Sequence, residues 1–282
     1  MQEPADRRHT LMRILLHFFL SLFSGLTISS VLMIALMDDM GDRLYLQILI
    51  SQMGLFIIPV VLFGILEYKK DFASKFMANR WPGFKVLSLS ILAIVSSFFF
   101  VQFLYKINKM LPLPEWMAVQ EADKMNLTEE VLNMTSTPDL MINLLIIGLL
   151  PALGEEFLFR GVIQKYIIQF TKKPWLGILV TAAVFSAIHF QFQGFIPRMV
   201  LGGLLGYLYW ISRSIWLPVI VHFFNNAYQI ILHYMFLTGE SELNLLEDIT
   251  VEWHTALISG GITAVLLIYL HQHIKKASDL LL

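Results

Sequence analysis

Long apolar runs separated by short polar connections dominate the hydrophobic pattern of this 282-residue chain. A helix rises about 1.5 Å per residue, so a run near 20 residues crosses the bilayer's hydrocarbon core of about 30 Å. Eight such runs predict eight transmembrane helices and therefore an all-α polytopic helical bundle. The expected spans are 11–37, 44–66, 86–107, 139–170, 174–190, 195–212, 215–238 and 251–271, and the fourth is long enough to extend past the bilayer.

The first run, 11–37, follows a short polar N-terminus. It is too long for the apolar core of a signal peptide, and no convincing small-residue cleavage site follows it. We therefore expect it to be retained as the first span.

Lysine and arginine gather in alternate connections, which predicts the orientation of the bundle. The connections 38–43, 108–138 and 240–252 are poor in basic residues. Because positive charge stays on the cytoplasmic side, the alternation predicts that both termini lie inside. The basic residues of the other connections are Arg7, Arg8, Arg13, Lys69, Lys70, Lys75, Arg80, Lys85, Lys165, Lys172, Lys173, Arg213, Lys275 and Lys276.

Composition supports a membrane protein and excludes several other classes. The chain is 57% hydrophobic and 15% charged, whereas soluble domains are about 45–50% apolar and about 25% charged. A net charge of −1 gives no electrostatic support for a nucleic-acid partner. The absence of cysteine from the sequence excludes thiol catalysis, thiolate metal sites and disulfides. We expect a multi-pass protein of the cell membrane, with the composition favouring a prokaryotic inner membrane.

Three regions follow from the pattern: 1–138 with the first three spans and a long outer loop, 139–238 with the polar spans, and 239–282 with an acidic loop, the last span and the tail. The 108–138 loop is the longest connection and predicts short helices at 115–124 and 128–134, the second starting at Thr128. The loop is either a solvated connection or a lid that guides a substrate.

Two adjacent carboxylates and an arginine interrupt the apolar fourth span, at Glu155, Glu156 and Arg160. A charge near the bilayer centre costs about 2.5–3.5 kcal/mol on insertion scales, so such groups indicate a functional site. Glu156 and Arg160 are four residues apart, in the order that favours an ion pair on one helix face. Glu155 lies about 100° around the helix, which leaves it as the chemically available carboxylate. The alternative is one ion cluster of all three that stabilises the bundle.

Pro151 lies just before these charges and cannot donate a hydrogen bond to the carbonyl of Ile147. Gly148 and Gly154 flank it. The sequence therefore predicts a kink or a widened turn immediately before Glu155.

Two later spans each carry a polar group beside aromatic residues. Phe185 and His189 share one helix face, as do His222 and Asn226, with Pro218 loosening the turn before the second pair. A single membrane histidine is more often a hydrogen-bonded packing residue than a catalyst. Three spans with such faces favour a common site.

These motifs resemble those of the CPBP family, which comprises CAAX proteases and bacteriocin-processing (Abi) intramembrane peptidases. The likeness covers about residues 139–230 in order and spacing. The motifs are Glu155-Glu156-x-x-x-Arg160, Phe185-x-x-x-His189 and His222-x-x-x-Asn226.

The resemblance implies an intramembrane endopeptidase that hydrolyses a peptide bond of a membrane-associated protein or peptide. Glu155 and His189 would bind and activate the water, and His222 and Asn226 would stabilise the oxyanion. The supporting residues would be Glu156, Arg160 and Phe185, which hold the site together. Eukaryotic relatives cleave prenylated CAAX proteins, but the sequence does not identify a substrate.

Metal dependence has two readings. Glu155, His189 and His222 would make a zinc site with an open fourth position, and the family was first described as metalloproteases. The resemblance favours a glutamate-dependent mechanism without a cofactor, which we expect here.

Two other functions compete with hydrolysis. One is a catalytically silent membrane protein of the same fold, acting as an immunity factor or scaffold. The other is a transporter, because buried acids and histidines also form proton relays. A simple drawing of eight spans separates His189 and His222 in depth, so tilted helices, a break at Gly202–Gly203 or a sixth span that enters only partway is needed.

Overall fold

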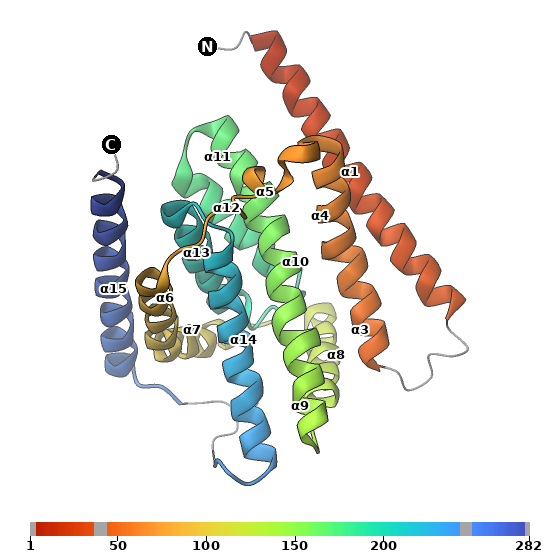
Figure 1. Ribbon diagram of the computed structural model, residues 1–282. Coiled ribbons are helices and arrows are strands. Elements are labelled where there is room, and N and C mark those ends of the chain that lie inside the picture. The colour runs from red at the N-terminus through yellow and green to blue at the C-terminus, as the bar shows by residue number, and fades with distance from the viewer. Residues whose placement is uncertain (1–3, 37–43, 243–249, 280–282) are drawn as a thin grey trace.

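The computed structural model describes residues 4–36, 44–242 and 250–279, and all regular secondary structure in these ranges is helical (Figure 1). The predicted all-α fold is confirmed. The connection 38–43 lies outside the described residues, as does most of the connection 240–252.

Five helical stretches of the described chain are long and apolar enough to cross a membrane: Arg8–Ala35, Leu44–Lys75, Phe84–Lys109, Thr137–Thr171 and Trp253–Lys276. They correspond to expected spans one to four and eight. The first and last contain α1 (Pro4–Ala35) and α15 (Trp253–Asp279). The second joins α3 (Leu44–Gln52), η1 (Met53–Ile57), α4 (Ile58–Phe63), η2 (Gly64–Tyr68), η3 (Lys69–Asp71) and α5 (Phe72–Lys75).

The three remaining expected spans are also helices, namely α12 (Pro174–Ala187), α13 (Phe195–Ser212) and α14 (Trp216–Leu237). The 14 residues of α12 rise only about 21 Å, at about 1.5 Å per residue. In Figure 1, α12 and α13 end short of the level that α9 and α14 reach. Of the three alternatives for this region, a break at Gly202–Gly203 is excluded, because α13 is continuous there. A shallow α12–α13 hairpin instead keeps the turn that follows α12 near the depth of α10.

The fourth stretch consists of α9 (Thr137–Asn143), η4 (Leu144–Leu149), α10 (Leu150–Leu158), η5 (Phe159–Gln164) and α11 (Lys165–Thr171). Its 35 residues rise about 50 Å at about 1.5 Å per residue, well beyond the hydrocarbon core of about 30 Å. The expectation that this helix extends past the bilayer is met by its length.

The third stretch is broken at Ser97 into α6 (Phe84–Ser96) and α7 (Phe98–Lys109). A serine of α15 satisfies the backbone at the break: the Ser259 hydroxyl donates to the Ser96 carbonyl and accepts from the Phe100 N–H. Freed backbone groups at membrane depth need such a partner. The break turns α7 away from α6 and toward the turn that follows α12.

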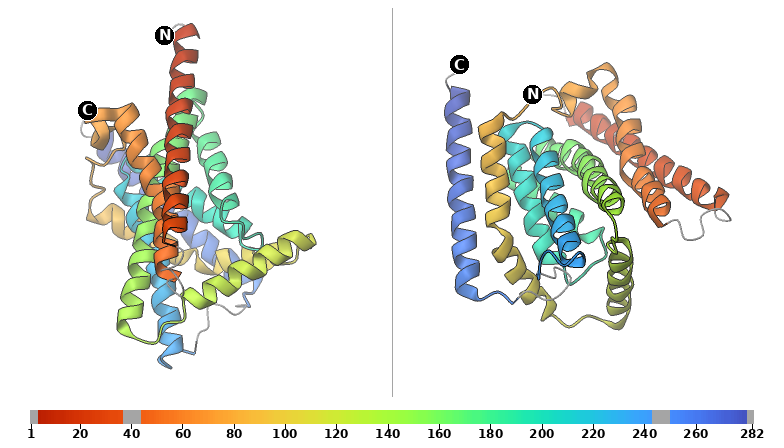
Figure 2. Two further views of the ribbon diagram at one scale, coloured as in Figure 1. Left: turned by 90° about the vertical axis from the view of Figure 1, so that its right-hand side faces the viewer. Right: turned by 60° about the horizontal axis from the view of Figure 1, so that its bottom comes forward.

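The long 108–138 connection forms one helix, α8 (Glu115–Val131), and not the two predicted short ones. Thr128 does not start a helix but lies within α8. Its hydroxyl donates to the Lys124 carbonyl, one turn earlier in the same helix. The next helix start is Ser136, whose side chain accepts from the Asp139 N–H in a capping box. Figure 2 shows α8 running across the direction of the long helices.

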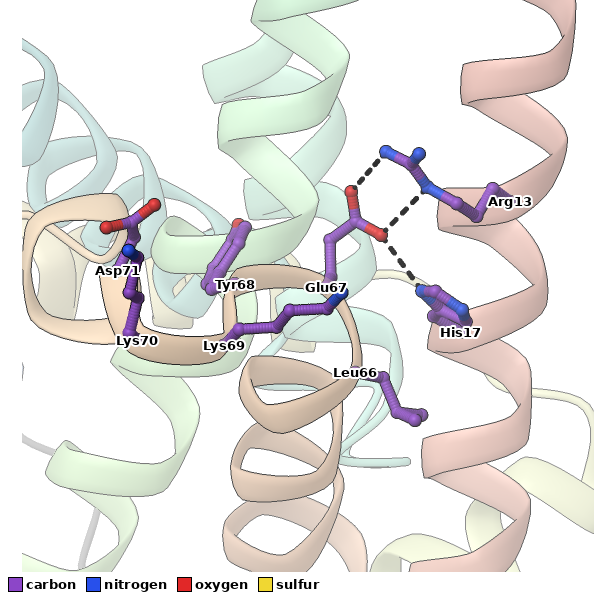
Figure 3. Close-up of a pocket in the computed structure, with 8 residues that line it drawn as sticks. All are labelled: Arg13, His17, Leu66, Glu67, Tyr68, Lys69, Lys70 and Asp71. Carbon is purple, nitrogen blue, oxygen red and sulfur yellow. Dashed lines mark hydrogen bonds and ion pairs between the residues drawn. The ribbon is translucent and has the colours of Figure 1, made fainter.

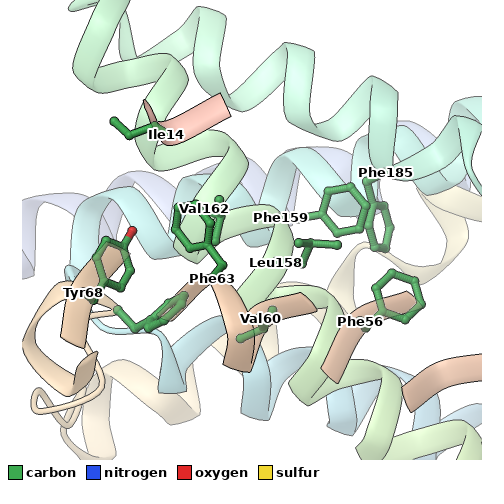
Figure 4. Close-up of a cluster of buried hydrophobic side chains, with 10 residues drawn as sticks. Ile14, Phe56, Val60, Phe63, Tyr68, Leu158, Phe159, Val162 and Phe185 are labelled. Carbon is green, nitrogen blue, oxygen red and sulfur yellow. The ribbon is translucent and has the colours of Figure 1, made fainter. Parts of the chain in front are cut away.

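An aromatic core lies around α10 and η5. It joins Phe56 and Phe63 of the second stretch to Phe159 and to Phe185 of α12 (Figure 4). Close helix approach depends on Gly154, where a Cβ would lie 2.7 Å from the Cβ of Phe56. This core fixes α10 against its neighbours and so fixes the two glutamates.

The start of α1 and the end of α15 lie at the same end of the bundle (Figure 1). This agrees with an even number of crossings. The count of eight spans, the orientation toward the cytoplasm and the division into 1–138, 139–238 and 239–282 stay predictions.

Candidate active site

The double glutamate lies on α10 between two wide helical turns. The π-helical turn η4 ends at Leu149, two residues before Pro151, and η5 begins at Phe159. The widened turn expected before Glu155 is therefore present. It arises because Pro151 cannot continue the α-helical hydrogen-bond ladder. The side chains that α10 presents are deeply buried, with Glu155 5% and Glu156 0% exposed.

Glu156 forms the predicted ion pair with Arg160. The distance from Arg160 Nη1 to Glu156 Oε1 is 2.9 Å, and both side chains are fully buried. The guanidinium also donates to the Gly202 carbonyl at 2.9 Å and lies 4.9 Å from the Phe185 ring centroid. Arg160 therefore ties α10 to both α12 and α13.

The same oxygen of Glu156 also accepts from His222. The distance from His222 Nδ1 to Glu156 Oε1 is 2.8 Å. A carboxylate accepts hydrogen bonds, so this contact puts a proton on Nδ1 and leaves Nε2 for other work. The sequence predicts only the Arg160 partner of Glu156, and the structure adds His222 as a second one.

Glu155 has no such close ionic contact in the described chain. Its nearest one is to His222, with 4.0 Å between Oε2 and Nε2. That distance is too long for a direct hydrogen bond. Arg160 and Arg198 act on Glu155 electrostatically from further away. Glu155 is thus a buried carboxylate beside an imidazole, with hydrogen-bonding capacity unused by the ion pair.

His189 lies in the turn after α12, not on the helix, since α12 ends at Ala187. Its Nδ1 is 2.7 Å from the Phe185 carbonyl. A carbonyl only accepts, so Nδ1 carries the proton and Nε2 of the neutral ring is an acceptor. The Phe185 ring lies 5.0 Å from His189 and 6.0 Å from His222, between centroids. Phe185 therefore stands beside both imidazoles.

Asn226 lies on α14, one turn after His222, and is half-buried. Its Oδ1 accepts from Asn225 at 3.5 Å. No hydrogen bond among the described residues joins Asn226 to Glu155 or to the two histidines. The structure thus brings Glu155, Glu156 and His222 into one cluster, with His189 reached through Phe185.

Arg198 of α13 was missed by the sequence reading. It is half-buried, donates to the Gln191 carbonyl at 3.4 Å and to the Gln191 side chain, and acts electrostatically on both Glu155 and His189. A signal was present, because an arginine inside the expected span 195–212 is itself an intramembrane charge.

The candidate zinc ligands do not form a metal centre as they are arranged. In the described ranges, no group of three or more His, Asp and Glu residues is close enough to hold a metal ion. His222 Nδ1 and His189 Nδ1 are both engaged with protein groups. These Nδ1 contacts leave both Nε2 atoms available, as in histidines that bind zinc, but the described side chains of Glu155, His189 and His222 are not gathered closely enough for the three-ligand zinc site. Metal dependence stays a prediction.

Away from the three motifs, a pocket of about 500 Å³ lies between α1 and the turn after α4 (Figure 3). There the Glu67 carboxylate binds Arg13 Nη2 and His17 Nδ1, each at 2.9 Å. None of the residues that line this pocket belongs to the three motifs. The contacts tie α1 to the second stretch.

Comparison with known proteins assigns the motif region to a family. Residues 137–228 match the family model described as type II CAAX prenyl endopeptidase Rce1-like. An uncharacterized 24.3 kDa protein of Escherichia coli is 36% identical over 91 residues, which are 31% of this chain and 42% of that protein. Bacillus subtilis YpbD, also uncharacterized, is 26% identical over 117 residues, or 40% of this chain and 55% of YpbD.

A third relative, named "Putative membrane peptidase YdiL" in Bacillus subtilis, is 23% identical over 176 residues, which are 62% of this chain and 67% of that protein. The chain thus spans about half the length of the first two relatives. No solved structure matches it.

The fold and the buried site define a multi-pass helical membrane protein with an intramembrane carboxylate–histidine cluster. Residues 137–228 match an Rce1-like domain, which is the CAAX-protease type of family that the three motifs of this region resemble.

Proposed function

We propose that the protein is an intramembrane endopeptidase that hydrolyses a peptide bond of a membrane-associated protein or peptide. The observation that carries the proposal is a 5% exposed carboxylate, Glu155, whose Oε2 lies 4.0 Å from His222 Nε2 inside an apolar bundle and makes no direct hydrogen bond to it. The Rce1-like domain at residues 137–228 supports the same reaction class.

In the proposed reaction, Glu155 and the Nε2 of His189 hold the attacking water. Glu155 takes a proton from it, the oxygen attacks the scissile carbonyl carbon, and Glu155 passes the proton to the departing amine. One water is consumed, and the products are a carboxylic acid and an amine, which become a carboxylate and an ammonium group when the acid proton moves to the amine. A carboxylate suits this work because it can accept a proton from water and pass it on within the same site.

The oxyanion would be stabilised by His222 and Asn226. In this role His222 donates from Nε2 while its Nδ1–H stays on Glu156, so it acts as the doubly protonated imidazolium. Asn226 adds a side-chain N–H from the next turn of α14. Removing one oxyanion donor typically costs about 10²–10³ in kcat.

The supporting residues fix the geometry and do not take part in bond making. Arg160 holds Glu156 and the Gly202 carbonyl, and Glu156 holds the His222 ring. Phe185 stands against Arg160 and both imidazoles. Donors and acceptors held in this way cost little reorganisation during reaction.

The test is cleavage of a panel of membrane-tethered peptides by purified protein in liposomes. We expect Glu155→Gln and His189→Gln to lose about 10²–10⁴ in rate, the usual contribution of general acid–base catalysis. Glu252→Gln, an exposed carboxylate outside the motif region, is the matched control. Equal cleavage by wild type and Glu155→Gln would refute the catalytic assignment, and a biological effect that survives Glu155→Gln would support the silent scaffold.

We propose further that the reaction needs no metal. Metal content is measured by elemental analysis on the same preparation, before and after a chelator. Activity that falls with chelation and returns with zinc contradicts the proposal.

A further inference from the structure

The turn between α12 and α13, which carries His189, is held from outside by α7. Asn108, 3% exposed at the end of α7, donates to the Phe192 carbonyl at 3.0 Å and accepts from the Ile196 N–H at 2.7 Å. One buried amide therefore spans the turn from one side to the other.

Helix α8 holds the same turn. The Glu121 carboxylate accepts from the N–H groups of Phe192, at 2.5 Å, and Gln193, at 3.3 Å. The Trp116 ring meets the Phe192 ring edge-on, 5.5 Å between centroids. The long connection is thus attached to the residues beside His189, which a plain solvated loop does not require.

An open cleft of about 290 Å³ lies between α8 and this turn. Gln120, Asp123 and Lys124 of α8 line it together with Phe190. The three α8 residues lie at i, i+3 and i+4 and so form one helix face. Phe190 directly follows His189, is 53% exposed, and adopts a positive φ of 53°, a conformation that is rare for a bulky residue and clusters at functional sites.

The cleft is next to the proposed catalytic groups and has a polar lining. Lys124 acts electrostatically on His189. The amide, carboxylate and ammonium groups that line the cleft complement the alternating N–H and C=O groups of an extended peptide. Phe190 offers an apolar face for one side chain of that peptide. The volume is at the small end of ligand pockets, about 300–1,000 Å³, which admits a short peptide segment and excludes a folded domain.

We infer that this cleft binds the polar flank of the substrate, the extended peptide segment on the water-facing side of the scissile bond. The apolar remainder of the substrate stays in the bilayer. The inference rests on the proposed peptidase function, and it assigns α8 the guiding role that the sequence left open.

The cysteine-free sequence allows a direct test by single-cysteine labelling. Gln120→Cys and Lys124→Cys are each made in the Glu155→Gln background, so that bound peptide is not cut. Glu129→Cys, exposed on the opposite face of α8, is the control. The labelling rate with a fluorescent maleimide is measured with each tethered peptide of the panel and with its apolar anchor alone.

We expect a peptide with its polar flank, at about ten times its Kd, to slow labelling at both cleft positions about tenfold. The anchor alone should have no effect, and Glu129→Cys should label at the same rate throughout. Unchanged labelling at the cleft positions with peptides that wild type cleaves overturns the inference while leaving the peptidase function standing. Protection without cleavage by wild type supports the cleft and refutes the peptidase function.

A second measurement uses charge. Lys124→Glu should shift the ratio of KM values for acidic-flanked and basic-flanked peptides about fivefold toward the basic ones, the size of one exposed charge pair. Because Lys124 also acts electrostatically on His189, kcat is compared within each variant and should change by the same factor for both classes of peptide. An unchanged KM ratio contradicts the inference.

Discussion

One oxygen of Glu156 accepts hydrogen bonds from both Arg160 and His222. The neighbouring Glu155 comes no closer than 4.0 Å to His222, from Oε2 to Nε2. Two neighbouring residues of the same type therefore have different duties. Glu156 compensates the charge of the buried Arg160 and orients the His222 ring. Glu155 is left with lone pairs for chemistry.

This difference predicts opposite phenotypes for the two isosteric substitutions. Glu156→Gln leaves the fully buried Arg160 without its counterion, and breaking a buried pair in this way typically costs about 3–5 kcal/mol of stability. Glu155→Gln should change stability little and abolish activity. Thermal unfolding in detergent, measured beside peptide cleavage, separates the two, and similar melting temperatures for both variants would contradict the division of duties.

The contacts that sequence reasoning found are local, and those it missed are not. Glu156 and Arg160 are four residues apart on one helix, so helical geometry alone predicts their pairing. Arg198 stands out as a charge in an apolar run, but nothing local says which carboxylate it serves. The partners Asn108 and Glu121 lie 84 and 71 residues before Phe192, and no periodicity reaches across that separation.

At the scale of elements, α10 is positioned by close approach to the second stretch. A Cβ on Gly154 would lie 2.7 Å from the Phe56 Cβ and 3.0 Å from Ile57 Cδ1. By contrast, Gly203 on α13 has open space around it. The two glycines therefore differ in what a methyl group would meet.

Gly154→Ala should destabilise the protein by about 1–3 kcal/mol, the usual cost of overpacking a core. Gly203→Ala is the matched control and should be neutral or stabilising by up to about 1 kcal/mol, because alanine is the better helix former. Unfolding of both variants in the same detergent checks this. A Gly154→Ala protein as stable as Gly203→Ala would mean that α10 can move away from Phe56 freely.

Helix α8 is where the element-level prediction from sequence failed. The pattern predicted two short helices, but no helix breaker separates Lys124 from Thr128, and the chain continues as one helix. Its attachment to the turn that carries His189 comes from Glu121 and Trp116. The sequence predicted helix in this connection, but it did not predict that the helix packs against the turn between α12 and α13.

Glu121→Ala should loosen the turn that carries His189. Hydrogen exchange at residues 188–196 should rise about tenfold, which corresponds to losing about 1.4 kcal/mol of local stability. We expect kcat to fall more than KM rises, because the variant loosens the position of His189 but leaves the residues of the turn in place. Glu130→Ala, an exposed carboxylate on the same helix, is the control, and a purely global loss of stability with unchanged local exchange would speak against the positioning role.

At the scale of the whole molecule, the central α10 is surrounded by helices from both halves of the chain. The C-terminal α15 packs on α6 and α7, and α1 packs on α4 and η1. The motif region alone therefore does not make the bundle. The sequence pattern predicted the long apolar helices, because each run has to satisfy its own backbone within lipid, but it did not predict which of them pack together.

The predicted orientation can be tested with the cysteine-free chain. Glu129→Cys on α8 should react with a membrane-impermeant maleimide added to intact cells, because its connection is poor in basic residues and should lie outside. Lys172→Cys, in the basic connection between α11 and α12, should react only after permeabilisation. The reverse labelling pattern would contradict the predicted orientation and place both termini outside.

The Glu156–Arg160 pair has a consequence for how the protein is synthesised. Because the arginine is on the same helix, four residues along, that helix brings its own counterion when it leaves the translocon and enters lipid. Glu155 meets its imidazole partner only when α14 has been translated. Insertion of the span and completion of the site are therefore separate events in synthesis, the first local to one helix and the second waiting for α14.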